Sequence, residues 1–145
     1  MATIKITKLG VAISQLEMAI DLFLKNQDLI CVITLAGAAE EILGRYAANS
    51  NEIPMIELLC SSLKNEYSID MPDKDFKWQY LNKARNLAKH FDNEENEIIE
   101  FDPELEALTM LIRAIGNLFS HDETVTYNTP EFMHWIYENR KDLLS

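Results

Sequence analysis

Apolar residues recur at steps of three and four along most of this chain, the spacing that places side chains on one face of an α-helix. Residues 28–48 are apolar on almost every face for three turns, so we expect this helix to be the most buried element. Within it, Gly37 and the adjacent alanines would let a neighbouring helix approach closely. An amphipathic helix is predicted before it, over residues 7–25, from the positions Leu9, Ala12, Ile13, Leu16, Ala19, Ile20, Phe23 and Leu24.

Polar residues predict where the next helices begin. Asp28 is suited to cap the second helix, and Ser50 and Asn51 are suited to cap a third helix over residues 51–65. A fourth helix is predicted over residues 73–91, after the turn-forming sequence SIDMPD.

The last two helices begin at a shared sequence pattern. The segments DPE (102–104) and TPE (129–131) each place a proline in the first helical turn and an acid beside it, where the helix dipole stabilises negative charge. They predict a fifth helix over residues 103–119 and a last helix from about residue 129. The acidic residues 92–102 have little periodicity and are predicted to form a loop.

These segments together predict an all-α fold, an up-and-down helical bundle of five to six helices without a strand. The composition agrees, because the chain has only four glycines and four prolines in 145 residues. A chain of this length with 48% hydrophobic residues can bury one good core, so we expect a single domain over residues 1–145.

Cysteines and apolar runs bear on the environment of the protein. Cys31 and Cys60 lie in apolar stretches without C-x-x-C spacing, so we expect two reduced core residues and neither a disulfide nor a zinc site. The first apolar segment is interrupted by Gln15, Glu17 and Asp21 and therefore fails as a signal-peptide core. No run approaches the roughly 18 apolar residues that span a bilayer. We expect a cytoplasmic protein that does not bind a membrane.

Charge is unevenly distributed along the chain. The net charge of −11 argues against broad, sequence-independent binding to nucleic acids, which depends on many lysines and arginines. Residues 74–90 are the exception, because they have a local charge of +4 from one acid, Asp75, and five basic residues: Lys74, Lys77, Lys83, Arg85 and Lys89.

A helix over residues 73–91 separates into two arcs. Arg85 and His90 lie about 140° apart around such a helix, so one ligand touches both only if it crosses the helix or if a second subunit presents its own copy. The polar arc consists of Lys74, Asn82, Arg85, Asn86, Lys89 and His90. The apolar arc consists of Phe76, Tyr80, Leu81, Ala84, Leu87, Ala88 and Phe91.

The polar arc has the chemistry of a phosphodiester site. A guanidinium group presents a planar fork of donors to phosphate oxygens, and an imidazole transfers protons near neutral pH. The reaction suggested is attack by a ribose 2′-hydroxyl, with His90 as general base or acid and Arg85 stabilising the developing charge. This reaction requires no metal and no cofactor. Alternatively, the same residues form the solvated face that any helix of a bundle needs.

The sequence Arg85-Asn86-Leu87-Ala88-Lys89-His90 resembles the signature of HEPN domains (higher eukaryotes and prokaryotes nucleotide-binding). That signature is an arginine, four to six residues and a histidine, commonly with a polar residue directly after the arginine. HEPN domains are helical bundles of similar length in which a buried early helix has a polar or acidic residue facing the motif. The segment ITLAGAAEEILGR, with Glu40 and Glu41, is similar to that helix.

The resemblance implies an RNA-binding protein or a metal-independent endoribonuclease. Arg85 and His90 would be the catalytic pair, Asn86 would assist, and Glu40 or Glu41 would orient the arginine. The resemblance also implies a homodimer whose motif helices face each other across one cleft. Many such domains act in toxin–antitoxin pairs or phage defence, so RNA and a protein partner such as an antitoxin are the expected partners. Side chains on the same helix would contact the RNA: Lys74, Asn82, Lys89 and Trp78, the last by stacking on a base.

The main alternative is a non-catalytic dimeric helical bundle that binds a protein partner with the same face. Glu131 and His134 have the E-x-x-H spacing of di-iron bundles, but the sequence lacks the second such pair, so we predict no metal site. Glycine-rich phosphate loops and the G-x-S-x-G elbow are also absent, which leaves nucleotide hydrolysis and serine-hydrolase chemistry without support.

Overall fold

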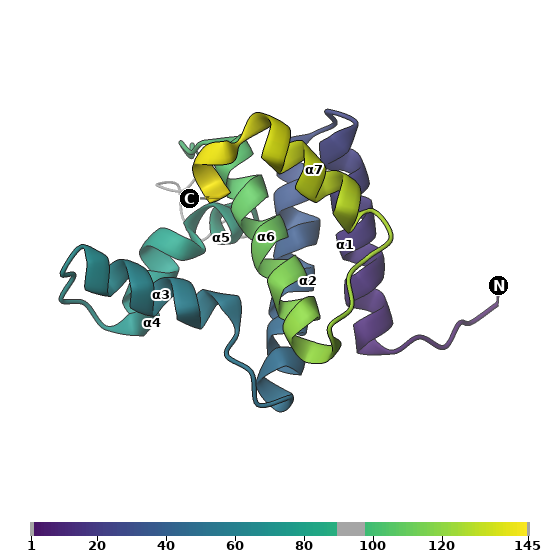
Figure 1. Cartoon of the computed structure of the whole chain (residues 1–145), viewed down its shortest axis with the longest axis horizontal. Coiled ribbons are helices and arrows are strands. Elements are labelled where there is room, and N and C mark those ends of the chain that lie inside the picture. The colour runs from purple at the N-terminus through teal and green to yellow at the C-terminus, as the bar shows by residue number, and fades with distance from the viewer. Residues whose placement is uncertain (1, 90–97, 145) are drawn as a thin grey trace.

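The computed structural model describes residues 2–89 and 98–144, and within these ranges the chain is helical and has no strand (Figure 1). Three long helices form the centre of the bundle: α1 (Lys8–Leu24), α2 (Leu29–Asn49) and α6 (Pro103–Asp122). Helix α2 lies between α1 and α6 and packs extensively on both. The predicted all-α helical bundle is confirmed.

Shorter helices lie to one side of these three (Figure 1). Helix α3 (Met55–Glu66) is followed by α4 (Asp73–Phe76), a π-helical segment η1 (Lys77–Leu81) and α5 (Lys83–Lys89). The helix α3 contacts α6 and η1, whereas α5 contacts α2. Part of the predicted basic helix therefore packs against α2, the middle one of the three long helices. The expectation that α2 is the most buried element is wrong, because α6 has nine buried residues and α2 has eight.

The C-terminal helix closes one end of the main core. Helix α7 (Thr129–Asn139) crosses the bundle near α1 and is followed by a short 3-10 helix, η3 (Lys141–Leu144) (Figure 1). Phe132 of α7 is fully buried, and its ring meets that of Phe23 edge to face, with centroids 5.6 Å apart. Trp135 makes a similar contact with Phe23 at 4.7 Å. These aromatic contacts join α7 to the apolar face of α1.

Two helices start where the sequence predicts. Asp28 is the N-cap of α2, and its carboxylate accepts a hydrogen bond from the Ile30 backbone N–H at 2.8 Å. Asp102 is the N-cap of α6 and accepts from the Leu105 N–H at 3.1 Å. Both carboxylates bind backbone donors that have no partner within the helix.

The predicted start of the third helix at Ser50 and Asn51 is wrong. Ser50 follows the last turn of α2, where its hydroxyl donates to the Tyr46 carbonyl oxygen at 3.0 Å. Asn51 has a left-handed backbone with φ of 62°, the conformation in which many helices end. Helix α3 begins only at Met55, directly after Pro54. The polar pair thus ends one helix instead of beginning the next.

The predicted uninterrupted helix over residues 73–91 is also wrong, because η1 divides it. The Asn82 backbone N–H donates to the Lys77 carbonyl at 2.8 Å, a step of five residues instead of four. The extra residue rotates the following helix by about 100° relative to an unbroken α-helix. Asn82 and Asn86, predicted to face solvent, are therefore buried, whereas Tyr80, predicted on the apolar arc, is 59% exposed.

One of the two cysteines also differs from expectation. Cys60 is buried as predicted, but Cys31 is exposed. Cys31 lies on the same stripe of α2 as Ile30, Thr34 and Glu41, all of which are exposed, so this stripe forms the outer surface of the helix. Each helix in the described part of the chain is too short or too polar to span a bilayer.

Candidate functional site

A buried arginine of α6, Arg113, is the centre of a polar cluster between three helices. Its side chain is 0% exposed, and its Nε and Nη2 atoms donate to Oε1 of Glu40 at 3.2 and 2.8 Å. Its Nη1 donates to the Leu81 carbonyl at 3.1 Å, and Nη2 also donates to Oδ1 of Asn82 at 2.9 Å. Arg113 thereby connects α6 both to α2 and to the point where η1 meets α5.

The charge of Arg113 is costly to bury. Burial lowers the pKa of its guanidinium, and the adjacent Glu40 carboxylate opposes this shift. An arginine nevertheless stays protonated in a protein, so the pair remains ionic. Buried ion pairs add little stability compared with apolar packing. The clearest consequence of this pair is geometric, because Arg113 fixes the position of the Glu40 carboxylate.

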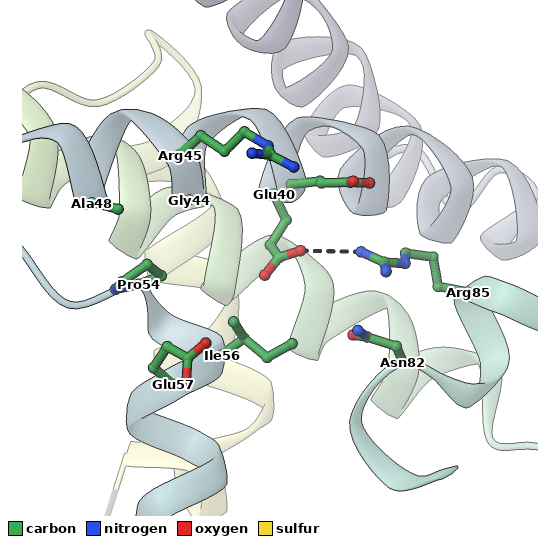
Figure 2. Close-up of a pocket in the computed structure, with 10 residues that line it drawn as sticks. Glu40, Gly44, Arg45, Ala48, Pro54, Ile56, Glu57, Asn82 and Arg85 are labelled. Atoms are coloured by element: carbon green, nitrogen blue, oxygen red, sulfur yellow. Dashed lines mark hydrogen bonds and ion pairs between the residues drawn. The ribbon is translucent and has the colours of Figure 1, made fainter. Parts of the chain in front are cut away.

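A second guanidinium group, that of Arg85, binds the other oxygen of Glu40. Its Nη1 donates to Oε2 at 3.2 Å, and the Arg85 side chain is only 12% exposed (Figure 2). Glu40 is therefore shared by two arginines, and the carboxylate of Glu106 on α6 also lies near enough to Arg113 to interact with its charge.

Two buried donors lie beside these charged groups. Among the described residues, neither the Arg85 Nε nor the Asn86 Nδ2 has a hydrogen-bond partner. Asn86 is 8% exposed, so water has little access to its amide. Leaving a buried donor unpaired costs about 1–3 kcal/mol. Arg85 and Asn86 both line a pocket, so a negatively charged ligand there would lie close to the Arg85 guanidinium group.

Pockets lie on either side of Arg85 and Asn82, which line both. The first, the basic pocket, has a volume of about 370 Å³. It is also lined by Asn86 and by residues of α4 and η1: Lys74, Asp75, Lys77 and Trp78. The second, the mixed-charge pocket, has a volume of about 340 Å³ and is drawn in Figure 2. Its further charged residues come from α2 and α3: Glu40, Glu41, Arg45 and Glu57.

Gly37 provides the room in which Arg85 reaches Glu40. A Cβ atom at position 37 would lie 2.5 Å from the Cδ and 2.7 Å from the Cγ of Arg85. The aliphatic part of the Arg85 side chain therefore passes directly over the backbone of α2. The sequence predicts a close approach at Gly37, and the approaching group is this side chain.

The predicted catalytic residues have different positions in the structure. Arg85, Asn86 and Glu40 lie together, and Arg85 pairs with Glu40. Glu41 is exposed and lines the mixed-charge pocket, on the other side of Arg85 from the basic pocket. His90 lies outside the described residues, so its distance from Arg85 stays a prediction.

Three of the four residues predicted to contact RNA line the basic pocket, and the fourth does not. Lys74 is exposed and Trp78 is 57% exposed, and both line the basic pocket. Asn82 lines it too, although its side chain oxygen is bound to Arg113. Lys89 is exposed at the end of α5 and is not among the described residues that line either pocket.

Sequence reasoning did not single out Arg113. A signal was present, because Arg113 is the only charged residue between Glu106 and His121 and lies among apolar residues. Its carboxylate partner is 73 residues away in sequence, so the pair becomes visible only once α6 packs on α2.

The other predicted constellations gain no support as reactive sites. Glu131 and His134 are both exposed on α7, and no group of three or more metal-binding side chains occurs among the residues described. His121 lies beyond the predicted end of the fifth helix at residue 119 but belongs to the last turn of α6, and its Nδ1 is 2.7 Å from the Ser50 hydroxyl. That contact joins α6 to the end of α2.

Comparison with known proteins yields no relative. No family model matches the chain, and neither the curated proteins nor the solved structures contain a significant match.

Removing the buried arginine is expected to destabilise the fold strongly. Arg113→Met should lower the free energy of unfolding by about 3–5 kcal/mol, because Glu40 loses its main partner while remaining buried. Urea denaturation measures this loss. Arg45→Met, which removes an exposed arginine of α2, is the control and should leave the unfolding midpoint nearly unchanged. Equal midpoints for the two variants would contradict the central position of Arg113.

The contact between Arg85 and Gly37 predicts that the effect of Gly37→Ala on the free energy of unfolding changes sign when Arg85 is replaced by alanine. Gly37→Ala should lower the free energy of unfolding by about 1–3 kcal/mol, since the new methyl group collides with the Arg85 side chain. In an Arg85→Ala background the same substitution should raise it by about 0.5–1 kcal/mol, because alanine favours helices over glycine. Denaturation of the four proteins tests both statements. The same effect in both backgrounds would show that Arg85 does not cross α2 at Gly37.

Proposed function

We propose that this protein binds single-stranded RNA with a phosphodiester against Arg85 and Asn86, and that it cleaves the strand there with His90 transferring a proton. The observation that supports binding is that two guanidinium groups share the Glu40 carboxylate and that one of them, Arg85, lines the basic pocket together with Asn86. Both the Arg85 Nε and the Asn86 Nδ2 lack a partner among the described residues. A phosphate in that pocket would lie beside the Arg85 guanidinium group, which suits phosphate oxygens.

The lining of the basic pocket favours a nucleic acid over a free anion. Trp78 lines the pocket and is 57% exposed, and a base can stack on an exposed indole ring. Lys74 provides a second positive charge. Stacking of this kind requires a base that is not already paired within a duplex, which favours a single strand. The basic residues of this pocket come from one short stretch, residues 74–85, of a chain whose net charge is −11.

Cleavage would proceed by transesterification within the RNA. The 2′-oxygen attacks the adjacent phosphorus, the bond from phosphorus to the 5′-oxygen breaks, and the products are a 2′,3′-cyclic phosphate and a 5′-hydroxyl. One proton leaves the 2′-hydroxyl and one joins the leaving 5′-oxygen, so no further reactant is needed. Arg85 would stabilise charge on the phosphate oxygens, and His90 would accept or donate one of the protons. The resemblance of the motif at positions 85–90 to HEPN domains supports these roles.

The same resemblance supports a homodimer in which a second copy supplies the facing motif helix, and a role in a toxin–antitoxin pair or phage defence. A protein partner in place of RNA is the competing proposal. It is favoured by Tyr80, which is 59% exposed and lies in sequence between Trp78 and Asn82, two residues that line the basic pocket. Binding measurements with RNA distinguish the two.

Binding should depend on the two residues with unpaired donors. Arg85→Ala and Asn86→Ala are each expected to weaken the affinity for a labelled single-stranded RNA by about tenfold or more, as expected when a hydrogen bond to a charged group is lost. Fluorescence anisotropy with 2′-O-methyl RNA measures affinity without cleavage. Lys83→Ala removes an exposed charge of the same helix and is the matched control. An equal loss in the control, or no binding by the unchanged protein, would contradict the proposal.

Cleavage should occur in EDTA and require the imidazole. The unchanged protein is expected to convert a single-stranded RNA into products ending in a 2′,3′-cyclic phosphate, and His90→Ala should reduce the rate by about 100-fold or more, the size of a general acid–base contribution. Gel electrophoresis and mass analysis of the fragments measure both. Equal rates for the two proteins would exclude His90 from catalysis, and binding without cleavage by either would leave an RNA-binding protein.

A further inference from the structure

A third pocket extends the site beyond Arg85. It has a volume of about 460 Å³ and lies between the start of α1 and the C-terminal half of α2. Its cationic residues are Lys8 and Arg45, both exposed. The Leu9 backbone N–H donates to the Tyr46 hydroxyl at 3.2 Å, which holds the first turn of α1 against α2. This bond fixes Lys8 beside the same pocket as Arg45.

The three pockets form a series because neighbouring pockets share walls. Asn82 and Arg85 line both the basic and the mixed-charge pocket. Glu41 and Arg45 line both the mixed-charge pocket and the third one. Arg45 and Arg85 both border the mixed-charge pocket, on which Figure 2 is centred. A single extended ligand could therefore contact all three pockets.

Charges alternate along this series. Cations lie at the basic pocket and at Arg85, and again at Arg45 and Lys8. The mixed-charge pocket between them has the carboxylate of Glu41, whereas the carboxylate of Glu57 is ion-paired with Lys77. Carboxylates repel a phosphate but accept hydrogen bonds from the amino and imino groups of bases. The order of phosphate, base and phosphate in a single strand matches this order of charges.

We propose that Lys8 and Arg45 form a second phosphate subsite, which binds the same RNA strand one pocket away from Arg85, with a base in the mixed-charge pocket. This inference rests on the proposed function. It adds that affinity should depend on strand length, because a short RNA reaches only the Arg85 site. Lys8 and Arg45 contribute to binding and not to the chemical step.

The experiment compares a dinucleotide with a decanucleotide, both of 2′-O-methyl RNA, at several salt concentrations. The double variant Lys8→Ala/Arg45→Ala should bind the decanucleotide about tenfold more weakly, and its plot of log affinity against log salt should be shallower by about 1.4, which corresponds to two phosphates. Its affinity for the dinucleotide should be unchanged. The matched control is Lys25→Ala/Lys141→Ala, which removes two exposed lysines that line none of these three pockets.

Each result separates this inference from the proposed function. Unchanged decanucleotide binding by Lys8→Ala/Arg45→Ala, or a loss equal to that of the control, overturns the second subsite, while sensitivity to Arg85→Ala would preserve the first. An equal loss for dinucleotide and decanucleotide also overturns it, because the two cations would then belong to the Arg85 site. Failure of the unchanged protein to bind either RNA overturns both proposals. Circular dichroism establishes that the variants remain folded.

Discussion

The arrangement of this site depends on one carboxylate shared by two guanidinium groups. Glu40 is fixed from one side by the fully buried Arg113 and binds Arg85 on the other. Three helices meet at this carboxylate, because Glu40 belongs to α2, Arg85 to α5 and Arg113 to α6. Arg85 and Asn86, which have unpaired donors among the described residues, line a pocket beside this carboxylate. The same cluster thus joins three helices and places an arginine at a pocket of an acidic protein.

The sequence predicts those parts of the fold that depend on local interactions. Amphipathic spacing identifies the long helices, and Asp28 and Asp102 cap helices a few residues away. Ser50 and Asn51 mislead because small polar residues occur at both ends of helices, and only the left-handed backbone of Asn51 decides between them. The π-helical segment is harder to predict, since the Leu81 carbonyl at its end is bound by Arg113, a residue far away in the chain.

The candidate site likewise contains residues that the sequence predicts and residues that it does not. Arg85 and Asn86 are found from their local motif, and Glu40 from its position on a long apolar helix next to α1 and α6. Arg113 is not predicted, because the role of an arginine on an apolar face cannot be recognised until its carboxylate partner is known. The predicted arcs of the basic helix also place Asn82 and Asn86 toward solvent, since an unbroken period of 3.6 residues was assumed. One additional residue in the helix reverses that assignment.

This additional residue has a consequence for the evolution of the protein. Loss of a single residue within Lys77–Leu81 would restore an ordinary α-helix and rotate the following turns by about 100°. Asn82, Arg85 and Asn86 would then point away from α2, while the three long helices would keep their packing. Bundle and site can therefore be inherited separately. Homologous chains that differ by one residue here would share the architecture without sharing the arrangement of these three side chains.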